Sequence, residues 1–248
     1  MKFRVPWIIA LGMLLSLSAA AITNTTTLYL IGDSTMADKP VLPANPERGW
    51  GQLLSLYFRE SLRVENHAVN GRSAKSFVSE GRWKKIVDRL APGDYVLIQF
   101  GHNDQKDKSP SGGAFGHYKK FLERYVRETR ERQAIPILAT SVVRRRFDKQ
   151  GRFFDTLGDY PKVTRQVAQD MQVPLLDLHN QTAGLLEKLG SEKSTMLYNH
   201  LGPGEHPEHA NGLADDTHFN AVGATRVCDL AADEISIKVP SLATHLRR

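Results

Sequence analysis

The stretch LYLIGDSTMAD, residues 28–38, passes from an apolar run of β-forming residues into Gly32, Asp33 and Ser34 and then into polar residues. The apolar run predicts a buried strand, and Gly, Asp and Ser are common in the turn after a strand. Ser34 is therefore either an ordinary turn residue or a nucleophile at the end of a strand. The choice depends on whether the rest of the chain supplies a base, an acid to orient it, and donors for a developing oxyanion.

Apolar runs of this kind recur along the chain, and segments with helical periodicity separate them. The predicted strands cover residues 27–31, 62–69, 95–100, 135–140 and 173–178. The predicted helices cover residues 49–60, 73–90, 115–133, 159–171, 179–189 and 221–237, the last with Asn220 as its N-cap. Apolar strands that alternate with helices are typical of a parallel sheet covered on both faces. The sequence predicts an α/β fold, a three-layer α/β/α sandwich with a five-stranded parallel sheet, and one long irregular stretch over 191–217.

The amino terminus of the 248-residue chain has the pattern of an export signal. Two basic residues precede an apolar run that ends in small residues at Ala21. The run is shorter than the roughly 20 residues of a spanning helix, so it predicts a signal peptide over residues 1–21. Residues 22–248 are enough for a single domain with a full core. We expect the mature protein to be secreted or periplasmic, with no membrane attachment.

Charge and cysteine content narrow the classes of partner. The formal net charge is +6, and two of the basic residues belong to the predicted signal peptide. The dense basic run at 142–149 lacks the interleaved aromatic residues of a nucleic-acid surface, so we interpret it as a solvated loop and expect no nucleic-acid partner. Cys228 is the only cysteine, which excludes a disulfide within the chain. We expect it to be a small buried hydrophobe in the last helix.

Polar clusters follow the first three predicted strands. Ser34 follows the first, NGRS (70–73) the second and GHND (101–104) the third. In a parallel sheet these segments meet at the carboxyl edge, where ligands bind. Within them, Gly71 lets the backbone approach a ligand and Asn103 offers a neutral amide donor, as an oxyanion requires.

A base for the serine is available in ADDTHFNAVGA, residues 214–224. Asp215 precedes His218 by three residues, a spacing that lets the carboxylate reach one imidazole nitrogen while the other faces a nucleophile. The alternative is that these acidic residues only cap and solvate the start of the last helix. The spacing alone leaves both interpretations open.

Four segments together resemble the conserved blocks of the GDSL-like, or SGNH, hydrolases: GDST (32–35), NGRSAKSF (70–77), GHND (101–104) and DDTH (215–218). Within that superfamily, GDSTMAD and the segment that ends in ADDTHFNAVGA resemble the rhamnogalacturonan acetylesterase group. The likeness extends over essentially the whole mature chain. It implies the flavodoxin-like fold of SGNH hydrolases and a serine carboxylic ester hydrolase with no cofactor and no metal.

The resemblance also implies a role for individual residues. Ser34 matches the nucleophile of the family, and His218 and Asp215 match its base and orienting acid. The N–H groups of Ser34 and Gly71 and the amide of Asn103 match its oxyanion hole. The implied partner is an acetylated polysaccharide that contains galacturonate, from which such enzymes remove acetyl groups.

Substrate contacts are less constrained by the sequence. We name Arg72 as a contact for a substrate carboxylate and His200 and His206 as residues that line the substrate cleft; the alternative is that these side chains are solvated. A metal-binding interpretation of the histidines near 200–209 lacks the usual ligand motifs. In the segment 155–161 the family leads us to expect a histidine where Leu157 stands, which bears on the substrate contacts of that loop.

Other functions remain alternatives. An esterase of this fold can act on acetylated xylan, small sugars, a lysophospholipid or a thioester, because fold and triad fix the reaction but not the acyl or alcohol group. A metal-dependent phosphoesterase would need further acidic ligands, and GDST has no second carboxylate. A carbohydrate-binding protein without catalysis would have no use for an aligned base.

Overall fold

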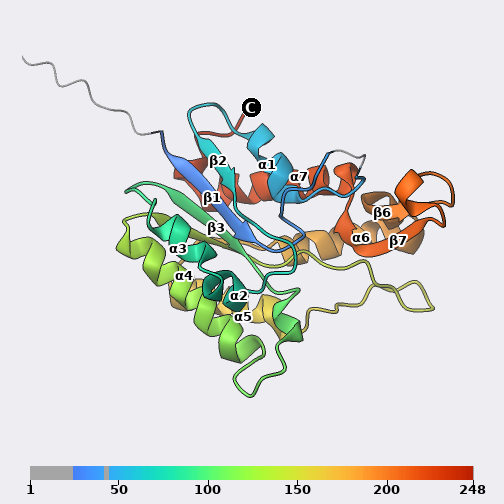
Figure 1. Cartoon of the computed structure of the whole chain (residues 1–248), viewed down its shortest axis with the longest axis horizontal. Coiled ribbons are helices and arrows are strands. Elements are labelled where there is room, and N and C mark those ends of the chain that lie inside the picture. Colours follow the sequence, from blue (N-terminus) through green and yellow to red (C-terminus); the bar gives the residue numbers. More distant parts are fainter. Residues whose placement is uncertain (1–24, 42–44, 248) are drawn as a thin grey trace, which may run out of the picture.

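The computed structural model describes residues 25–41 and 45–247. At its centre is a parallel five-stranded sheet with the strand order β2-β1-β3-β4-β5. The strands are β1 (Thr27–Gly32), β2 (Arg63–Asn66), β3 (Tyr95–Gln99), β4 (Ile135–Ala139) and β5 (Leu175–Leu176). Figure 1 shows helices on both sides of this sheet. The predicted α/β/α sandwich is confirmed.

Strand β1 supplies apolar side chains to both faces of the sheet. Leu28 and Leu30 join one hydrophobic cluster, and Tyr29 and Ile31 join the other. The first cluster includes helices α1 (Trp50–Leu54), α6 (Leu178–Lys193), α7 (Ala221–Lys238) and α8 (Pro240–Ala243). The second includes α2 (Ala74–Ser79), α3 (Arg82–Val87), α4 (Lys119–Glu131) and α5 (Asp159–Asp170). A strand buried on both faces needs apolar residues at successive positions, which explains the continuous apolar run.

Several helix boundaries differ from the predicted ones. The predicted helix over 73–90 is divided into α2 and α3, because Gly81 has a left-handed φ of 71°. The helix predicted over 49–60 ends at Leu54 and continues only as a 3₁₀ turn, Ser55–Tyr57. Asn220 caps α7 as expected, since its side chain accepts a hydrogen bond from the Gly223 N–H at 3.1 Å.

A β-hairpin lies in the stretch that we expected to be irregular, so that prediction was wrong. Its strands are β6 (Tyr198–Leu201) and β7 (Leu213–Phe219), and they pair antiparallel. In Figure 1 the hairpin projects beside α6, away from the central sheet. The segment in β7 is polar and lacks the alternation of a half-buried strand, which explains why its pattern did not predict one.

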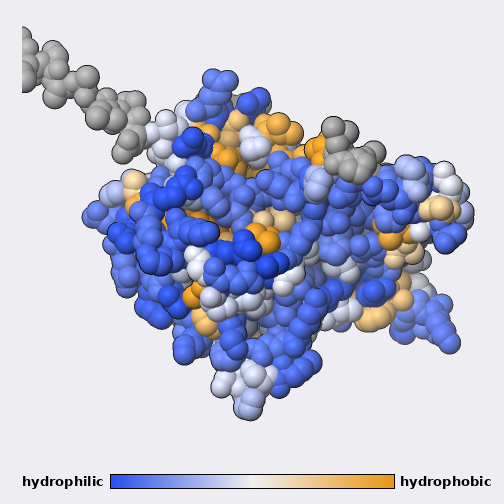
Figure 2. All heavy atoms as spheres, in the orientation of Figure 1, coloured by the Kyte–Doolittle hydropathy of each residue, from blue (hydrophilic) through white to orange (hydrophobic). Residues whose placement is uncertain are grey.

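Most of the surface seen in Figure 2 is hydrophilic, with small separate hydrophobic patches. Within the described part of the chain, no helix combines the length and apolar character needed to cross a bilayer. The predicted signal peptide, residues 1–21, lies outside the described residues. Cys228 is fully buried and its Sγ donates to the Trp50 carbonyl at 3.0 Å, as expected for a small core residue.

Candidate active site

Ser34 lies in the tight turn that follows β1. Asp33 Oδ1 accepts hydrogen bonds from the Thr35 N–H at 3.0 Å and the Thr35 hydroxyl at 2.9 Å, which closes the turn beneath Ser34. The Thr35 hydroxyl accepts in turn from Gln99 Nε2 at 2.8 Å, and Gln99 Oε1 accepts from the Trp50 indole at 3.0 Å. These supporting side chains are buried. The turn is therefore fastened to β3 and α1 by satisfied polar groups.

Asp33 remains ionised beneath this turn. Its Oδ2 lies 3.4 Å from Nδ1 of His102, and both side chains are buried. Burial alone would raise the pKa of the Asp33 carboxyl, but the His102 charge and the Thr35 donors outweigh burial and lower it. His102 also lines the pocket described below.

Asp215 and His218 lie on β7, at a break in its pairing with β6. Two successive residues of β6 pair with Asp215 and Phe219, so the three residues between these positions bulge outward. Asp215 Oδ1 accepts from the N–H groups of Thr217 at 2.7 Å and His218 at 3.0 Å. This turn brings the His218 ring back to the Asp215 carboxylate. In a regular strand, side chains three residues apart point to opposite faces.

A continuous chain of hydrogen bonds joins the three residues that resemble the family triad. His218 Nδ1 lies 2.7 Å from Asp215 Oδ2, and His218 Nε2 lies 2.9 Å from Ser34 Oγ. With Nδ1 protonated and donating to the carboxylate, Nε2 is free to accept the serine proton. The alternative interpretation, in which these acidic residues only cap the last helix, does not account for the contact between Asp215 and His218.

The pKa values of Asp215 and His218 are shifted in opposite directions: that of Asp215 is lowered and that of His218 is raised. Burial would raise the pKa of Asp215, but hydrogen bonds from the His218 ring and two backbone N–H groups lower it to about 2. For His218, burial acts to lower the pKa, while the hydrogen bond to Asp215 and the charge of Glu47 outweigh it and raise the pKa. The carboxylate therefore stays charged, and the imidazole becomes a stronger base.

Glu47 and Lys39 were not singled out from the sequence. The Lys39 side chain is almost fully buried, and its Nζ lies 2.5 Å from both Glu47 Oε1 and Asn70 Oδ1. Glu47 lies in the same segment after β1 as Lys39, and the contact with Asn70 links that segment to the loop after β2 beside the pocket. The local sequence around a lysine does not show whether its side chain will be buried, because its partners come together only when the loops fold.

The predicted oxyanion donors flank Ser34. Gly71 has a φ of 76°, which favours glycine, and a Cβ there would meet no atom within 4 Å. Among the described residues, the N–H groups of Ser34 and Gly71 donate to no acceptor. Asn103 Nδ2 donates to the Arg72 carbonyl at 3.2 Å, and Asn103 Oδ1 accepts from Lys106 Nζ at 2.8 Å. Lys106 thus helps to orient the Asn103 amide.

These segments surround one pocket of about 460 Å³. Its lining residues are Ser34, Glu47, Asn70, Gly71, His102, Asn103, Lys106, Arg144, Thr217 and His218. The structure therefore brings the strand-end clusters and the hairpin to one place, as expected for the carboxyl edge of a parallel sheet. Asp215 lies behind His218 and outside the lining.

The residues named from the sequence for substrate binding, Arg72, His200 and His206, do not line this pocket. Arg72 Nε lies 3.0 Å from Glu80 Oε2, and Arg72 Nη1 donates to the Asn70 carbonyl. His200 Nε2 lies 2.8 Å from Asp216 Oδ1. His206 is buried and its Nδ1 accepts from a backbone N–H in the hairpin loop. Their assignment to substrate binding stays a prediction.

Other titratable groups near the site have structural contacts. Asp104, the last residue of GHND, accepts from the Ala74 N–H at 3.0 Å at the start of α2, and burial raises its pKa to about 7. The Leu157 side chain, at the position where the family leads us to expect a histidine, is fully buried. Within residues 25–41 and 45–247, no group of three or more His, Cys, Asp or Glu side chains is placed to hold a metal ion.

Fold and site together define an ester hydrolase of the serine type, and comparison with known proteins gives its family. The model of the GDSL-like lipase/acylhydrolase family matches residues 30–226. The chain belongs to this family and is a serine carboxylic ester hydrolase.

Relatives with assigned activities are carbohydrate esterases. The chain is 42% identical over 219 residues to rhamnogalacturonan acetylesterase RhgT of Bacillus subtilis strain 168, covering 88% of this chain and 93% of that protein. It is 30% identical over 239 residues to the rhamnogalacturonan acetylesterase of Emericella nidulans, covering 87% of each.

Solved structures have the same fold. Protein YxiM of Bacillus subtilis superposes with a TM-score of 0.72 at 27% identity, over 86% of this chain and 56% of that one, so this chain spans only about half of YxiM. The acetylxylan esterase Axe2 of Geobacillus stearothermophilus has a TM-score of 0.59 at 19% identity, over 86% and 94% of the two chains. At this identity, the likeness to Axe2 concerns the fold alone.

Proposed function

We propose that this protein removes O-acetyl groups from rhamnogalacturonan in pectin through an acyl-enzyme intermediate on Ser34. The observation that carries the reaction is the hydrogen-bond chain from Ser34 Oγ through His218 to Asp215. The substrate class is supported by the 42% identity to a rhamnogalacturonan acetylesterase over most of both chains.

Acylation begins when His218 Nε2 takes the proton of Ser34 and the serine oxygen attacks the acetyl carbonyl carbon. The carbonyl oxygen becomes an oxyanion, which accepts hydrogen bonds from the N–H groups of Ser34 and Gly71 and the Asn103 amide. When the tetrahedral species collapses, the bond to the sugar oxygen breaks. His218 then gives its proton to that oxygen and the deacetylated sugar leaves.

Deacylation repeats these steps with water as the nucleophile. His218 accepts a proton from water, whose oxygen attacks the acetyl group on Ser34. Collapse of the second tetrahedral species releases acetate, and the proton returns to the serine oxygen. Asp215 remains ionised throughout and stabilises the imidazolium that forms twice in each cycle, which agrees with its lowered pKa.

The test is acetate release from acetylated rhamnogalacturonan, acetylated xylan and a chromogenic acetate ester, with a chelator present. Wild type is compared with Ser34→Ala and with Ser79→Ala, which alters an exposed serine of α2. We expect release to be fastest on rhamnogalacturonan, lost in Ser34→Ala and retained in Ser79→Ala. Faster release from xylan would overturn the pectin assignment and leave the mechanism standing. Release by Ser34→Ala would overturn the mechanism.

We further propose that residues 1–21 direct export, that they are cleaved, and that residues 22–248 act as one secreted or periplasmic domain. The basis is the charged start and short apolar run of the sequence. Amino-terminal sequencing of the exported protein tests this. A mature chain that retains Lys2 and Arg4 would contradict it.

A further inference from the structure

The candidate active-site pocket contains positive charge that no carboxylate neutralises at contact distance. Arg144, from the loop after β4, and Lys106, from the loop after β3, both line it. The carboxylate that lines it, Glu47, is already paired with buried Lys39. Within the described part of the chain, neither Arg144 nor Lys106 forms an ion pair, and their hydrogen bonds go to uncharged oxygens. A carboxylate ligand would complement this wall.

Arg144 differs from the two arginines that follow it. Arg145 Nη1 and Arg146 Nη1 bind the two oxygens of Asp216 at 2.9 and 2.7 Å, which fastens this loop to the hairpin. Arg144 donates instead to three neutral acceptors, at 3.0, 3.1 and 3.4 Å: Gln105 Oε1, Thr156 Oγ1 and the His102 carbonyl. These contacts orient the guanidinium and leave its charge available.

The partial burial of Arg144 strengthens its attraction for an anion. The side chain is partly buried, and burial lowers the pKa of its guanidinium; from longer range Asp33 raises this pKa, Arg146 lowers it and Asp155 raises it. Asp33 is itself occupied by His102 and Thr35. A partly desolvated cation gains more from a bound anion than a solvated one does, because water no longer screens the attraction.

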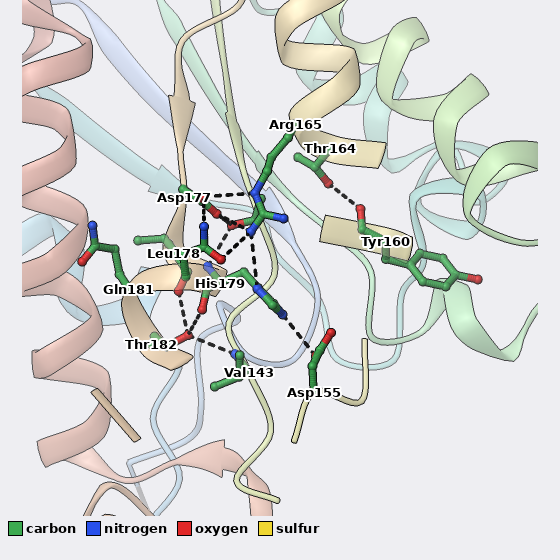
Figure 3. Close-up of polar contacts among 12 residues, drawn as sticks. Val143, Asp155, Tyr160, Thr164, Arg165, Asp177, Leu178, His179, Gln181 and Thr182 are labelled. Carbon is green, nitrogen blue, oxygen red and sulfur yellow. Dashed lines mark hydrogen bonds and ion pairs between the residues drawn. The ribbon is translucent and has the colours of Figure 1, made fainter. Parts of the chain in front are cut away.

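The loop that carries Arg144 is anchored near both ends to the start of α6 (Figure 3). The Val143 N–H donates to Thr182 Oγ1 at 3.1 Å, directly before Arg144. At the other end, Asp155 Oδ1 lies 3.1 Å from His179 Nε2. The guanidinium is thus held in place before a substrate arrives, which lowers the entropic cost of binding.

We infer that Arg144 is a specificity-determining residue that binds a carboxylate of the substrate close to the ester being cleaved, with Lys106 adding charge to the same wall. This inference rests on the proposed deacetylation of a galacturonate-containing polysaccharide. The planar guanidinium can donate two parallel hydrogen bonds to a carboxylate. Arg72, which the sequence suggested for a substrate contact, is already paired with Glu80.

The test measures the preference for a charged over a neutral substrate. The substrates are an acetylated galacturonate-containing oligosaccharide with free carboxylates and the same oligosaccharide after methyl esterification of its carboxylates. Arg144→Gln and Arg144→Lys are compared with wild type. Arg152→Gln is the matched control, since Arg152 lies in the same loop, is exposed and pairs with Asp148. Lys106 is left unchanged because it also orients Asn103.

We expect wild type to prefer the free-carboxylate substrate in kcat/KM by roughly 10- to 100-fold, mainly through KM. This ratio should fall toward unity in Arg144→Gln, be partly retained in Arg144→Lys and be retained in Arg152→Gln. Equal cleavage of both substrates by wild type would overturn the inference, as would an Arg144→Gln enzyme that is slower on both substrates with the ratio intact. Wild type that cleaves a chromogenic acetate but neither oligosaccharide would overturn the proposed function as well.

Discussion

The two halves of the proposed triad come from regions built in different ways. Ser34 stands on a turn at the end of a central strand, and the side chains that hold the turn are buried. Asp215 and His218 stand on a bulge in a hairpin outside the sheet, where Asp216 is held by Arg145 and Arg146 through partly exposed ion pairs. The distance of 2.9 Å between Ser34 Oγ and His218 Nε2 bridges these two regions.

Because of this difference, we expect substitutions beneath Ser34 to affect mainly stability and substitutions in the hairpin to affect mainly catalysis. Changes beneath Ser34 disturb buried polar groups of the core, so they reduce the free energy of unfolding. Residues 215–218 of the hairpin are only half-buried, and changes there leave its core residues Tyr198 and Phe219 in place, so they cost less free energy of unfolding. We expect the hairpin to affect mainly the position of the base, and therefore kcat.

The largest effect is expected for Ser34→Ala, which removes the nucleophile. It should lower kcat on the order of 10⁴- to 10⁶-fold, while the partly exposed site leaves the unfolding free energy within about 0.5 kcal/mol. Steady-state kinetics and thermal unfolding measure the two quantities. Near-normal turnover would remove Ser34 from the mechanism.

Asp215→Asn comes next, because an amide cannot hold His218 in the tautomer that leaves Nε2 free. We expect kcat to fall about 10³- to 10⁴-fold with little change in KM. Kinetics on the chromogenic ester give this value, and Asp148→Asn, on an exposed loop, serves as the control. A loss comparable to that of Asp148→Asn would show that the carboxylate does not orient the base.

Asp216→Asn and Thr35→Val together test the comparison of the two regions. Thr35→Val leaves Gln99 Nε2 without an acceptor and should cost about 1–3 kcal/mol of unfolding free energy. Asp216→Asn weakens the anchor of the hairpin and should lower kcat by up to about 10²-fold through misplacement of His218, with the smaller loss of stability. Chemical denaturation and steady-state kinetics on both variants measure these effects. A larger loss of unfolding free energy in Asp216→Asn than in Thr35→Val would contradict the comparison.

The smallest effect concerns pH. His218 must be neutral to accept a proton, and its pKa is raised, so activity falls as the pH drops through that value. Glu47→Gln removes a negative charge that raises the pKa, so the acidic limb of kcat/KM should move to lower pH. Glu80→Gln, outside the pocket, should leave the limb in place. A limb that stays fixed or moves to higher pH in Glu47→Gln would contradict this assignment.

The sequence predicted the sheet side of the site well and the hairpin side poorly. Apolar runs located the strands, and the carboxyl ends of parallel strands must meet, so Ser34, Gly71 and Asn103 were expected together. The spacing of Asp215 and His218 suggested a pair, but the bulge that joins them depends on contacts made far away in the sequence. Among these is the hydrogen bond from the Arg145 N–H to the Asp216 carbonyl.

The sequence pattern also did not predict which basic side chains are buried or line the pocket. The basic run at 142–149 was interpreted as a solvated loop, yet Arg144 lines the pocket and its two neighbours hold the hairpin. A cation with a buried role and one on a solvated face give the same local pattern. Their environment is decided only when distant loops come together.

The central claim is that His218 activates Ser34 across the junction of the two regions, and trapping of the acyl-enzyme tests it most directly. The protein is mixed with a chromogenic acetate ester, quenched in acid within one turnover, digested and mapped by mass spectrometry. The account predicts one acetyl group on the peptide that contains Ser34 in wild type, and none on it in Ser34→Ala or His218→Asn. An acetyl group on another residue, or acetate formed in the first turnover without any acetylated peptide, would contradict it.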